Sequence, residues 1–452
     1  MRLQEARHGG FVGSTPDPLE EGRLFTGTQR RDLLNFDGQR FELGCRSLLA
    51  GIGPPRLSRP LEGGLGRHRR LIVSTARDRT DGRETAVERR RIYSRPLLHV
   101  AFPLAWQDEL LVLAPLPAVV IANLAVDREW ARPLNLAICA VAIFLTGASG
   151  LINLIVALSG REPNLLAPAI LIGAAALAAP VLRVPVRARL ARLLPFDAES
   201  PVALLALVAV ILVVGLQANY QAGHDALAAV SASSQLQPID VVGQELPLLL
   251  MALLGVGLFT RRSLPAVLDR LGVVKPAAWQ VAAALAVAGL FLAVSQGAQE
   301  LQRVLDPALA DRLGQATSHY YGSINGWFGI AVIALGPGIA EEAFFRGALQ
   351  PRLGIWVAAL AFAAVHTQYA LTVDTLLVFA LGAGLGLVRR RLNTTSAMTA
   401  HAAYNALAGV GIPTALLPWA IPAEVLLVLV AIALWWGSRG LERIADRPQP
   451  RL

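Results

Sequence analysis

From residue 110 onward, long apolar runs alternate along the chain with short polar or basic segments. Runs of about 17 to 25 apolar residues are long enough to cross a bilayer as α-helices. The pattern therefore predicts an all-α protein, a polytopic transmembrane helical bundle of about ten spans. The expected spans are 133–157, 165–182, 202–219, 243–260, 277–296, 328–352, 355–371, 373–388, 394–411 and 414–436.

Basic loops predict how these spans are oriented. Arg and Lys gather at 183–192, 261–275, 346–352 and 389–391, whereas the loops 220–242 and 297–326 are neutral or mildly acidic. Short basic loops stay cytoplasmic, so we expect both termini in the cytoplasm. The arginine bias favours a bacterial cytoplasmic membrane. A further apolar run at 110–126 would break this alternation, so we expect it to lie in the interface or to re-enter.

The composition also divides the chain. Residues 1–96 are rich in Arg and Gly and contain few long apolar runs. Such a region could anchor anionic lipid or nucleic acid, but a disordered tail or a translated upstream stretch fits better, and we expect no nucleic-acid partner. We expect accessory transmembrane segments at 97–242, a core at 243–437 and a cytoplasmic tail at 438–452.

Charged residues interrupt one of the apolar runs, in the segment GIAEEAFFRGALQ at 338–350. A charge at mid-bilayer costs about 2.5–3.5 kcal/mol even on a lenient scale. On a helix, Glu342 and Arg346 stand at i and i+4 and can pair. Glu341 is rotated away from them by about 100° and stays unpaired, which suits a general base or acid. The alternative is a structural ion pair with a glutamate near the headgroups.

Two later segments carry polar residues to a similar depth. FAAVHTQY places His366 in the next expected span, and HAAYN places His401 and Asn405 one helical turn apart on a later one. Counted from the nearest basic turns, Glu341 and both histidines lie 10 or 11 residues into their spans. That distance is about 15–17 Å, roughly the middle of a ~30 Å hydrocarbon core. The sequence therefore predicts one site built from three helices.

In this order, the motifs resemble those of the CPBP intramembrane proteases, a family of CAAX prenyl endopeptidases and bacteriocin-processing, Abi-type proteins. The motifs are Glu-Glu-x-x-x-Arg at 341, 342 and 346, Phe-x-x-x-His at 362 and 366, and His-x-x-x-Asn at 401 and 405. The resemblance covers roughly residues 243–436.

The resemblance implies a role for each motif residue. Glu341 would activate a water with help from His366, and His401 with Asn405 would stabilise the oxyanion, for which both side chains can offer N–H donors. Glu342 and Arg346 would form a supporting ion pair.

A metal-dependent version of the same site stays open. A glutamate with two histidines is an acceptable zinc ligand set, so Glu341, His366 and His401 could hold Zn in a metalloendopeptidase. Against this, the sequence has no His-x-x-x-His pair, and Asn405 is a poor zinc ligand. No cofactor is certain.

We therefore predict a CAAX-protease-like intramembrane endopeptidase, a peptide hydrolase whose substrate is a membrane-associated protein or peptide in the lipid bilayer. The alternative is a non-catalytic membrane protein, either an immunity-type scaffold or a transporter. A transporter usually shows internal repeats or matching broken helices, and neither is visible. Two further acidic residues have structural interpretations: we expect Glu245 at the interface, and Asp374 as a cap at the outer surface.

Overall fold

The computed structural model describes residues 113–160, 164–411 and 414–445. All of these residues lie in the part of the chain that follows residue 96. The predictions for residues 1–96 therefore lie outside the described part of the chain, as does the end of the predicted tail.

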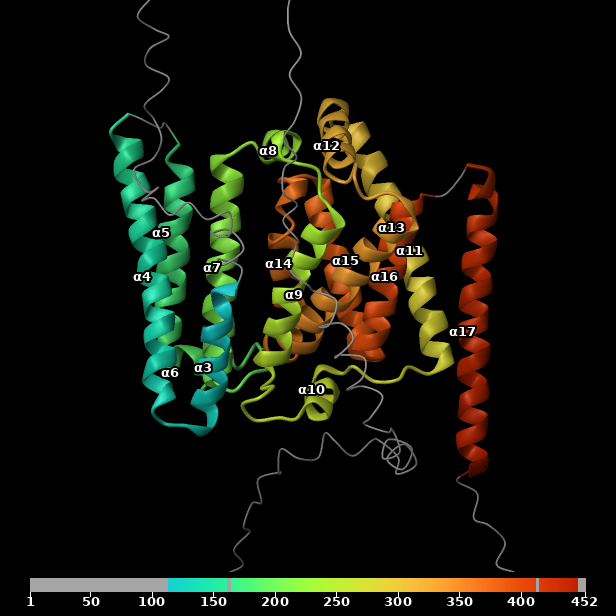
Figure 1. The fold of residues 1–452 in the computed structure, drawn as a ribbon, viewed down its shortest axis with the longest axis horizontal. Coiled ribbons are helices and arrows are strands. Elements are labelled where there is room, and N and C mark those ends of the chain that lie inside the picture. Colours follow the sequence, from blue (N-terminus) through green and yellow to red (C-terminus); the bar gives the residue numbers. More distant parts are fainter. Residues whose placement is uncertain (1–112, 161–163, 412–413, 446–452) are drawn as a thin grey trace, which may run out of the picture. The chain divides into compact units, whose positions relative to one another are not determined.

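All regular elements of the described residues are helices, so the all-α class is confirmed for this part of the chain (Figure 1). The earlier elements are α3 (Pro115–Asp127), α4 (Ala131–Leu158), α5 (Leu166–Ala178), η4 (Ala179–Leu182), α6 (Val184–Leu190), α7 (Pro201–Gly223), α8 (Ala226–Ala232), α9 (Pro238–Gly255) and α10 (Leu264–Leu271). The later ones are α11 (Ala278–Leu305), α12 (Pro307–Tyr320), α13 (Gly326–Glu341), η5 (Glu342–Leu349), α14 (Gln350–Ala364), η6 (Thr367–Tyr369), α15 (Val373–Arg391), α16 (Thr394–Val410), η7 (Thr414–Leu416) and α17 (Leu417–Ala445).

Six helical stretches of the described residues are long and apolar enough to cross a membrane. A seventh is added if the segments Leu166–Leu182 and Val184–Leu190, which meet at 99°, count as one bent span. The predicted count of about ten is therefore not confirmed. The reasons are local: α16 has only 17 residues, and α15 ends in three arginines. In addition, two predicted spans are joined in one helical stretch, Gly326–Ala364.

Gly354 separates those two predicted spans. Its φ of 81° and ψ of 170° are not helical, and glycine adopts such a φ without the steric cost that a Cβ would add. The chain therefore bends where the sequence predicts a turn. The following helix, α14, ends at Ala364 with Val365 as its C-cap, before the predicted limit of 371. His366 thus follows the helix directly instead of lying within a span.

The helix α3 covers most of the proline-interrupted run at 110–126. Its 13 residues correspond to a length of about 20 Å, which is less than the ~30 Å of a hydrocarbon core. The described part of this run is therefore too short to span a bilayer as a single helix, in keeping with the expectation for it.

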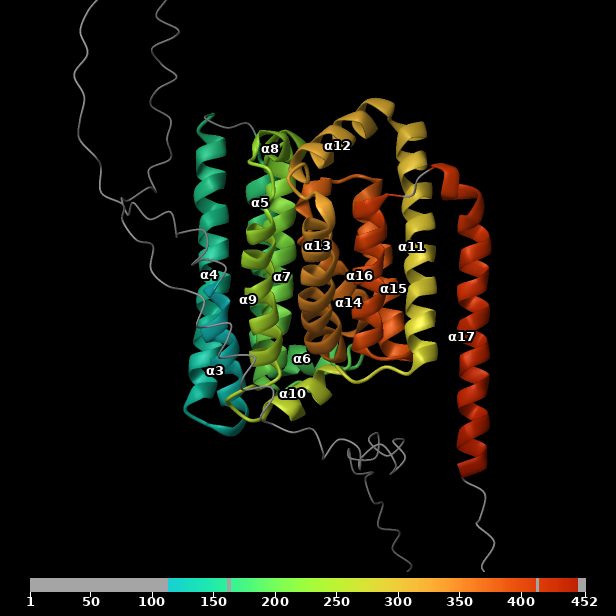
Figure 2. The same ribbon diagram turned by 45° about the vertical axis from the view of Figure 1, so that its right-hand side comes forward.

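The connecting segments sort to two ends of the bundle. The helices α6 and α10, which lie within the basic segments 183–192 and 261–275, stand at one end in both views (Figures 1 and 2). At the opposite end lie α8 and α12, within the neutral or acidic loops 220–242 and 297–326. The charge asymmetry of the sequence thus matches two opposite ends of the fold.

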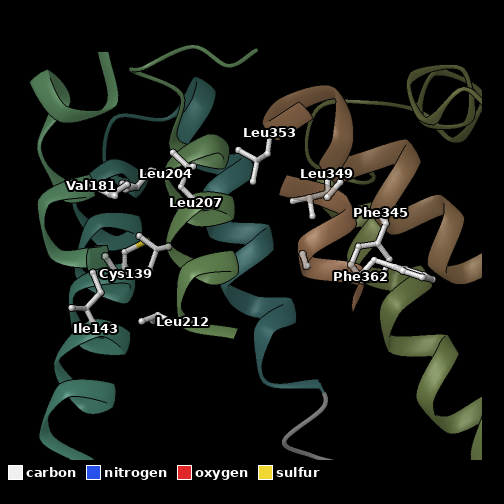
Figure 3. Packing of buried hydrophobic residues seen from close by; sticks show 14 of the residues in the cluster. Cys139, Ile143, Val181, Leu204, Leu207, Leu212, Phe345, Leu349, Leu353 and Phe362 are labelled. Carbon is white, nitrogen blue, oxygen red and sulfur yellow. The ribbon is translucent and has the colours of Figure 1, made fainter. Parts of the chain in front are cut away.

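The accessory helices pack against the core through one apolar cluster. Figure 3 shows Cys139, Leu204 and Leu207 on one side of this cluster, and Phe345 and Phe362 on the other. All five side chains are buried. The helices α4 and α7 therefore help to fix the segment that carries the Glu-Glu-x-x-x-Arg motif.

The two ends predict opposite accessibility. In a background lacking Cys45 and Cys139, single cysteines at Ser263, before α10, and Ser318, in α12, should react with membrane-impermeant reagents from opposite sides. By the positive-inside rule, Ser263 should be cytoplasmic. Labelling of both positions from the same side of intact cells would contradict the arrangement.

Candidate active site

The site begins where the helix geometry changes. The α-helix α13 ends at Glu341, and the next eight residues, Glu342–Leu349, continue as a π-helix. Single π-turns inside α-helices occur frequently at functional sites, because the wider turn changes which face each side chain occupies. Sequence periodicity gives no sign of this change.

Glu342 and Arg346 form a buried ion pair within this π-helix. Glu342 Oε1 lies 3.1 Å from Arg346 Nη1, and the side chains are 0% and 1% exposed. Arg346 Nη2 also donates a hydrogen bond to the carbonyl of Gly382 in α15, at 3.2 Å. The guanidinium carbon lies 4.3 Å from the ring centre of Phe362, a favourable cation–π position. The positive charge of Arg346 is therefore stabilised by the Glu342 carboxylate, the Gly382 carbonyl and the Phe362 ring.

The same carboxylate holds His401. Nδ1 of His401 lies 2.9 Å from Glu342 Oε1. A carboxylate paired with arginine can only accept, so Nδ1 carries the hydrogen. Nε2 of His401 then lies 3.8 Å from Glu341 Oε2. Glu342 thus orients the His401 ring so that Nε2 faces Glu341.

His366 is held by the backbone instead. Its Nδ1 lies 2.6 Å from the carbonyl oxygen of Phe362, which can only accept, so Nδ1 is the donor. Nε2 of His366 lies 3.9 Å from Glu341 Oε1. In a neutral imidazole with this tautomer, Nε2 is an acceptor. Both histidines therefore present Nε2 to Glu341.

Glu341 lies between the two rings without a direct hydrogen bond to either. Its Oε2 is buried and has no hydrogen-bond partner within the structure. A buried carboxylate oxygen that lacks a partner is rare in folded proteins and needs an explanation. The gaps of 3.8 and 3.9 Å to the histidines are too long for direct hydrogen bonds and leave Glu341 free to receive a proton.

Asn405, the fourth residue predicted to be catalytic, makes a hydrogen bond with a structural role. Its Nδ2 donates to the carbonyl of Ile333 at 3.2 Å. Pro337 lies inside α13 and has no N–H to bond the carbonyl four residues earlier, which is that of Ile333. Asn405 therefore supplies the donor that Pro337 lacks, while its second amide hydrogen stays available.

Close packing of α13 on α16 makes these contacts possible. A Cβ at Gly338 would lie 2.9 Å from the Cβ of Ala402 and 3.1 Å from its backbone, closer than real side chains approach. The glycine therefore lets the two helices come together directly beside Glu341, Glu342 and His401.

The site faces a cavity of about 640 Å³. All four residues predicted to be catalytic line it, and Thr317, Tyr321 and Ile324 extend it toward the α12 end of the bundle. The sequence predictions did not place Glu245 and Asp374 there, yet both line the cavity. Asp374 is also not the cap of α15, because Thr372 caps that helix by accepting from the Asp374 N–H.

Tyrosines form the part of the cavity wall nearest α12. The hydroxyl of Tyr321 is hydrogen-bonded to the side chains of Tyr369 and Gln368, and burial raises the pKa of Tyr321 to about 12. The neighbouring Tyr321 and burial together hold the pKa of Tyr369 well above its usual value. On a third element, Tyr404 shares a hydrogen bond with Ser295. The hydroxyls of Tyr321 and Tyr369 therefore stay neutral over the physiological range.

The geometry does not support the predicted zinc ligand set. Glu341, His366 and His401 do meet, but their facing atoms are 3.8 and 3.9 Å apart. Ligand atoms at the usual zinc distances in a tetrahedral site would be separated by about 3.3–3.4 Å. Among the described residues, no group of three or more His, Cys, Asp or Glu is arranged to hold a metal ion. The metalloendopeptidase expectation is therefore not supported.

The comparison with known families agrees with the motifs. Residues 323–407 match the family model for the type II CAAX prenyl endopeptidase Rce1-like proteins. This segment contains both glutamates, Arg346, both histidines and Asn405, so the resemblance to the CPBP and CAAX protease family is confirmed. The match supports a protease that is integral to the membrane. No curated protein and no solved structure matches the chain.

The two adjacent glutamates should differ in their effect on stability. Glu342→Gln leaves Arg346 uncompensated, and breaking a buried pair in this way costs about 3–5 kcal/mol. Glu341→Gln, the matched control, removes an oxygen that has no partner and should leave the thermal unfolding midpoint unchanged or raised. Equal midpoints for the two variants would show that the loss of the Glu342 charge does not leave Arg346 uncompensated.

Proposed function

We propose that the protein is an intramembrane endopeptidase that hydrolyses a peptide bond of a membrane-associated protein or peptide. The observation that carries this proposal is the Glu341 carboxylate, unpartnered and flanked by Nε2 of two histidines in a large cavity. A base must have a free acceptor atom within reach of a reacting proton. The Rce1-like match, which supports a protease, points to the same reaction class.

In this mechanism, a water lies between Glu341 and His366. Because His366 uses its Nδ1 hydrogen on the Phe362 carbonyl, its Nε2 accepts a hydrogen bond from the water and orients it. Glu341 removes one proton as the water oxygen attacks the carbonyl carbon. The C–N bond then breaks, and the proton passes from Glu341 to the leaving amine, which returns Glu341 to its carboxylate form.

Two groups can stabilise the oxyanion that forms during the attack. Asn405 has one amide hydrogen left after its bond to Ile333. His401 has its Nδ1 hydrogen on Glu342, so it can donate from Nε2 only as an imidazolium, whose charge the oxyanion itself would balance. Preorganised donors of this kind stabilise a transition state by several kcal/mol in a dry site.

A non-catalytic scaffold or transporter is the competing class, and turnover separates the two. The purified full chain in liposomes should cleave members of a peptide library, and Glu341→Gln should lower the rate by about 10²–10⁴-fold, as expected for a lost general base. Glu300→Gln serves as the control, because Glu300 is exposed and lies outside the cavity.

Native-rate cleavage by Glu341→Gln would refute its role as the base. Absence of cleavage by the native chain for every peptide would favour the non-catalytic class. Loss of activity with a chelator, restored by zinc, would favour a metal-dependent form of the same site.

A further inference from the structure

The cavity wall carries three carboxylates from three different helices. Glu245 of α9, Glu341 of α13 and Asp374 of α15 all line it. Each has one buried side-chain oxygen without a hydrogen-bond partner in the structure. No lysine or arginine is among the described residues that line this cavity. The wall therefore offers these three carboxyl groups no cationic side chain as a partner.

Ordinary structural roles do not account for this arrangement. Asp374 lies in the first turn of α15, where a helix dipole favours negative charge, but its Oδ1 accepts no hydrogen bond although the side chain is nine-tenths buried. Glu245 lies within α9, away from the helix ends. Buried polar groups without partners need an explanation, and a ligand in the cavity would supply a partner to all three carboxyl groups.

We propose that the cavity binds a positively charged substrate side chain, arginine or lysine, close to the scissile bond, with Glu245 and Asp374 as specificity-determining residues. This inference rests on the proposed endopeptidase function. Arginine offers five N–H donors in a fork that matches carboxylates, and tyrosine rings in the wall suit a guanidinium. A volume of about 640 Å³ is in the range of sites that enclose a drug-sized ligand, enough for side chains flanking a scissile bond.

The test uses peptides that differ at one position. For a peptide that the native chain cleaves, each position flanking the scissile bond is occupied in turn by arginine, by its uncharged analogue citrulline, and by glutamate. At one of these positions arginine should exceed citrulline in kcat/KM by about ten- to one-hundred-fold, the range for a hydrogen bond to a charged group. Glutamate should be the poorest.

Variants of the cavity wall test whether Glu245 and Asp374 cause the preference for arginine. Glu245→Gln and Asp374→Asn should each reduce the arginine-to-citrulline ratio several-fold. Asp311→Asn, which removes an exposed carboxylate of α12 outside the cavity, should keep the native ratio. The ratio compares two peptides on the same variant, so a partly unfolded preparation does not change it. If one cavity variant fails to fold, the other still reports.

The outcomes separate this inference from the proposed function. Cleavage with equal kcat/KM for arginine and citrulline at every position would overturn the inference and leave the endopeptidase standing. If no peptide is cleaved, the endopeptidase proposal fails. The Kd values of the same peptides for the native chain then test whether the cavity binds a cationic side chain. Tighter binding of the arginine peptide than of the citrulline peptide would support the inference, and equal binding would overturn it.

Discussion

A charge pair buried inside an apolar helix is the constraint around which this site is built. Glu342 and Arg346 are almost completely buried, where a single uncompensated charge would be strongly unfavourable. The pair persists because the surrounding elements contribute to it: the Gly382 carbonyl from α15, the Phe362 ring from α14 and the His401 imidazole from α16. Meeting the needs of one buried arginine brings these helices together, and Glu341 lies next to the point where they meet.

Packing explains how close the helices come. Gly338 allows α13 to lie directly on α16, and Gly382 exposes the carbonyl that accepts from Arg346. Small residues play this part between membrane helices because they let backbones approach. On the outer side of the pair, Phe345 and Phe362 stand edge to face, 5.3 Å apart, and join the apolar cluster shared with α4 and α7. The helices α4 and α7 thereby support the site, although none of their residues lines the cavity.

The sequence predicted the convergence of the motif residues because depth in a membrane can be counted along helices. Glu341, His366 and His401 could be assigned one level, and Glu342 with Arg346 could be paired by spacing. The sequence could not reveal the π-helix or the hydrogen bond from Asn405 to Ile333, because both depend on how the backbone hydrogen bonds of neighbouring turns are formed. Glu245 and Asp374 were misplaced for a related reason. Asp374 stands in the first turn of α15, where an acidic residue normally needs no explanation. Glu245 stands at the start of the predicted span 243–260, whereas the helix α9 begins earlier, at Pro238.

The count of spans shows a similar limit. Apolar runs mark where helices lie, and the turn at Gly354 follows the predicted boundary. The lengths were less predictable: α14 ends at Ala364, so that His366 leaves the helix and bonds the Phe362 carbonyl. Irregular backbone at this point gives the histidine its orientation, a role that an apolar pattern cannot indicate.

We infer that the buried pair orients the site and is not needed for stability as such. The double variant Glu342→Leu with Arg346→Met tests it most directly. Apolar side chains of similar volume can replace a buried ion pair at little cost or with a gain in stability, so the double variant should unfold near the native temperature, well above Glu342→Leu alone. Peptide cleavage should remain lost, because His401 no longer has an acceptor at Nδ1. A double variant that is stable and cleaves at the native rate would contradict the account.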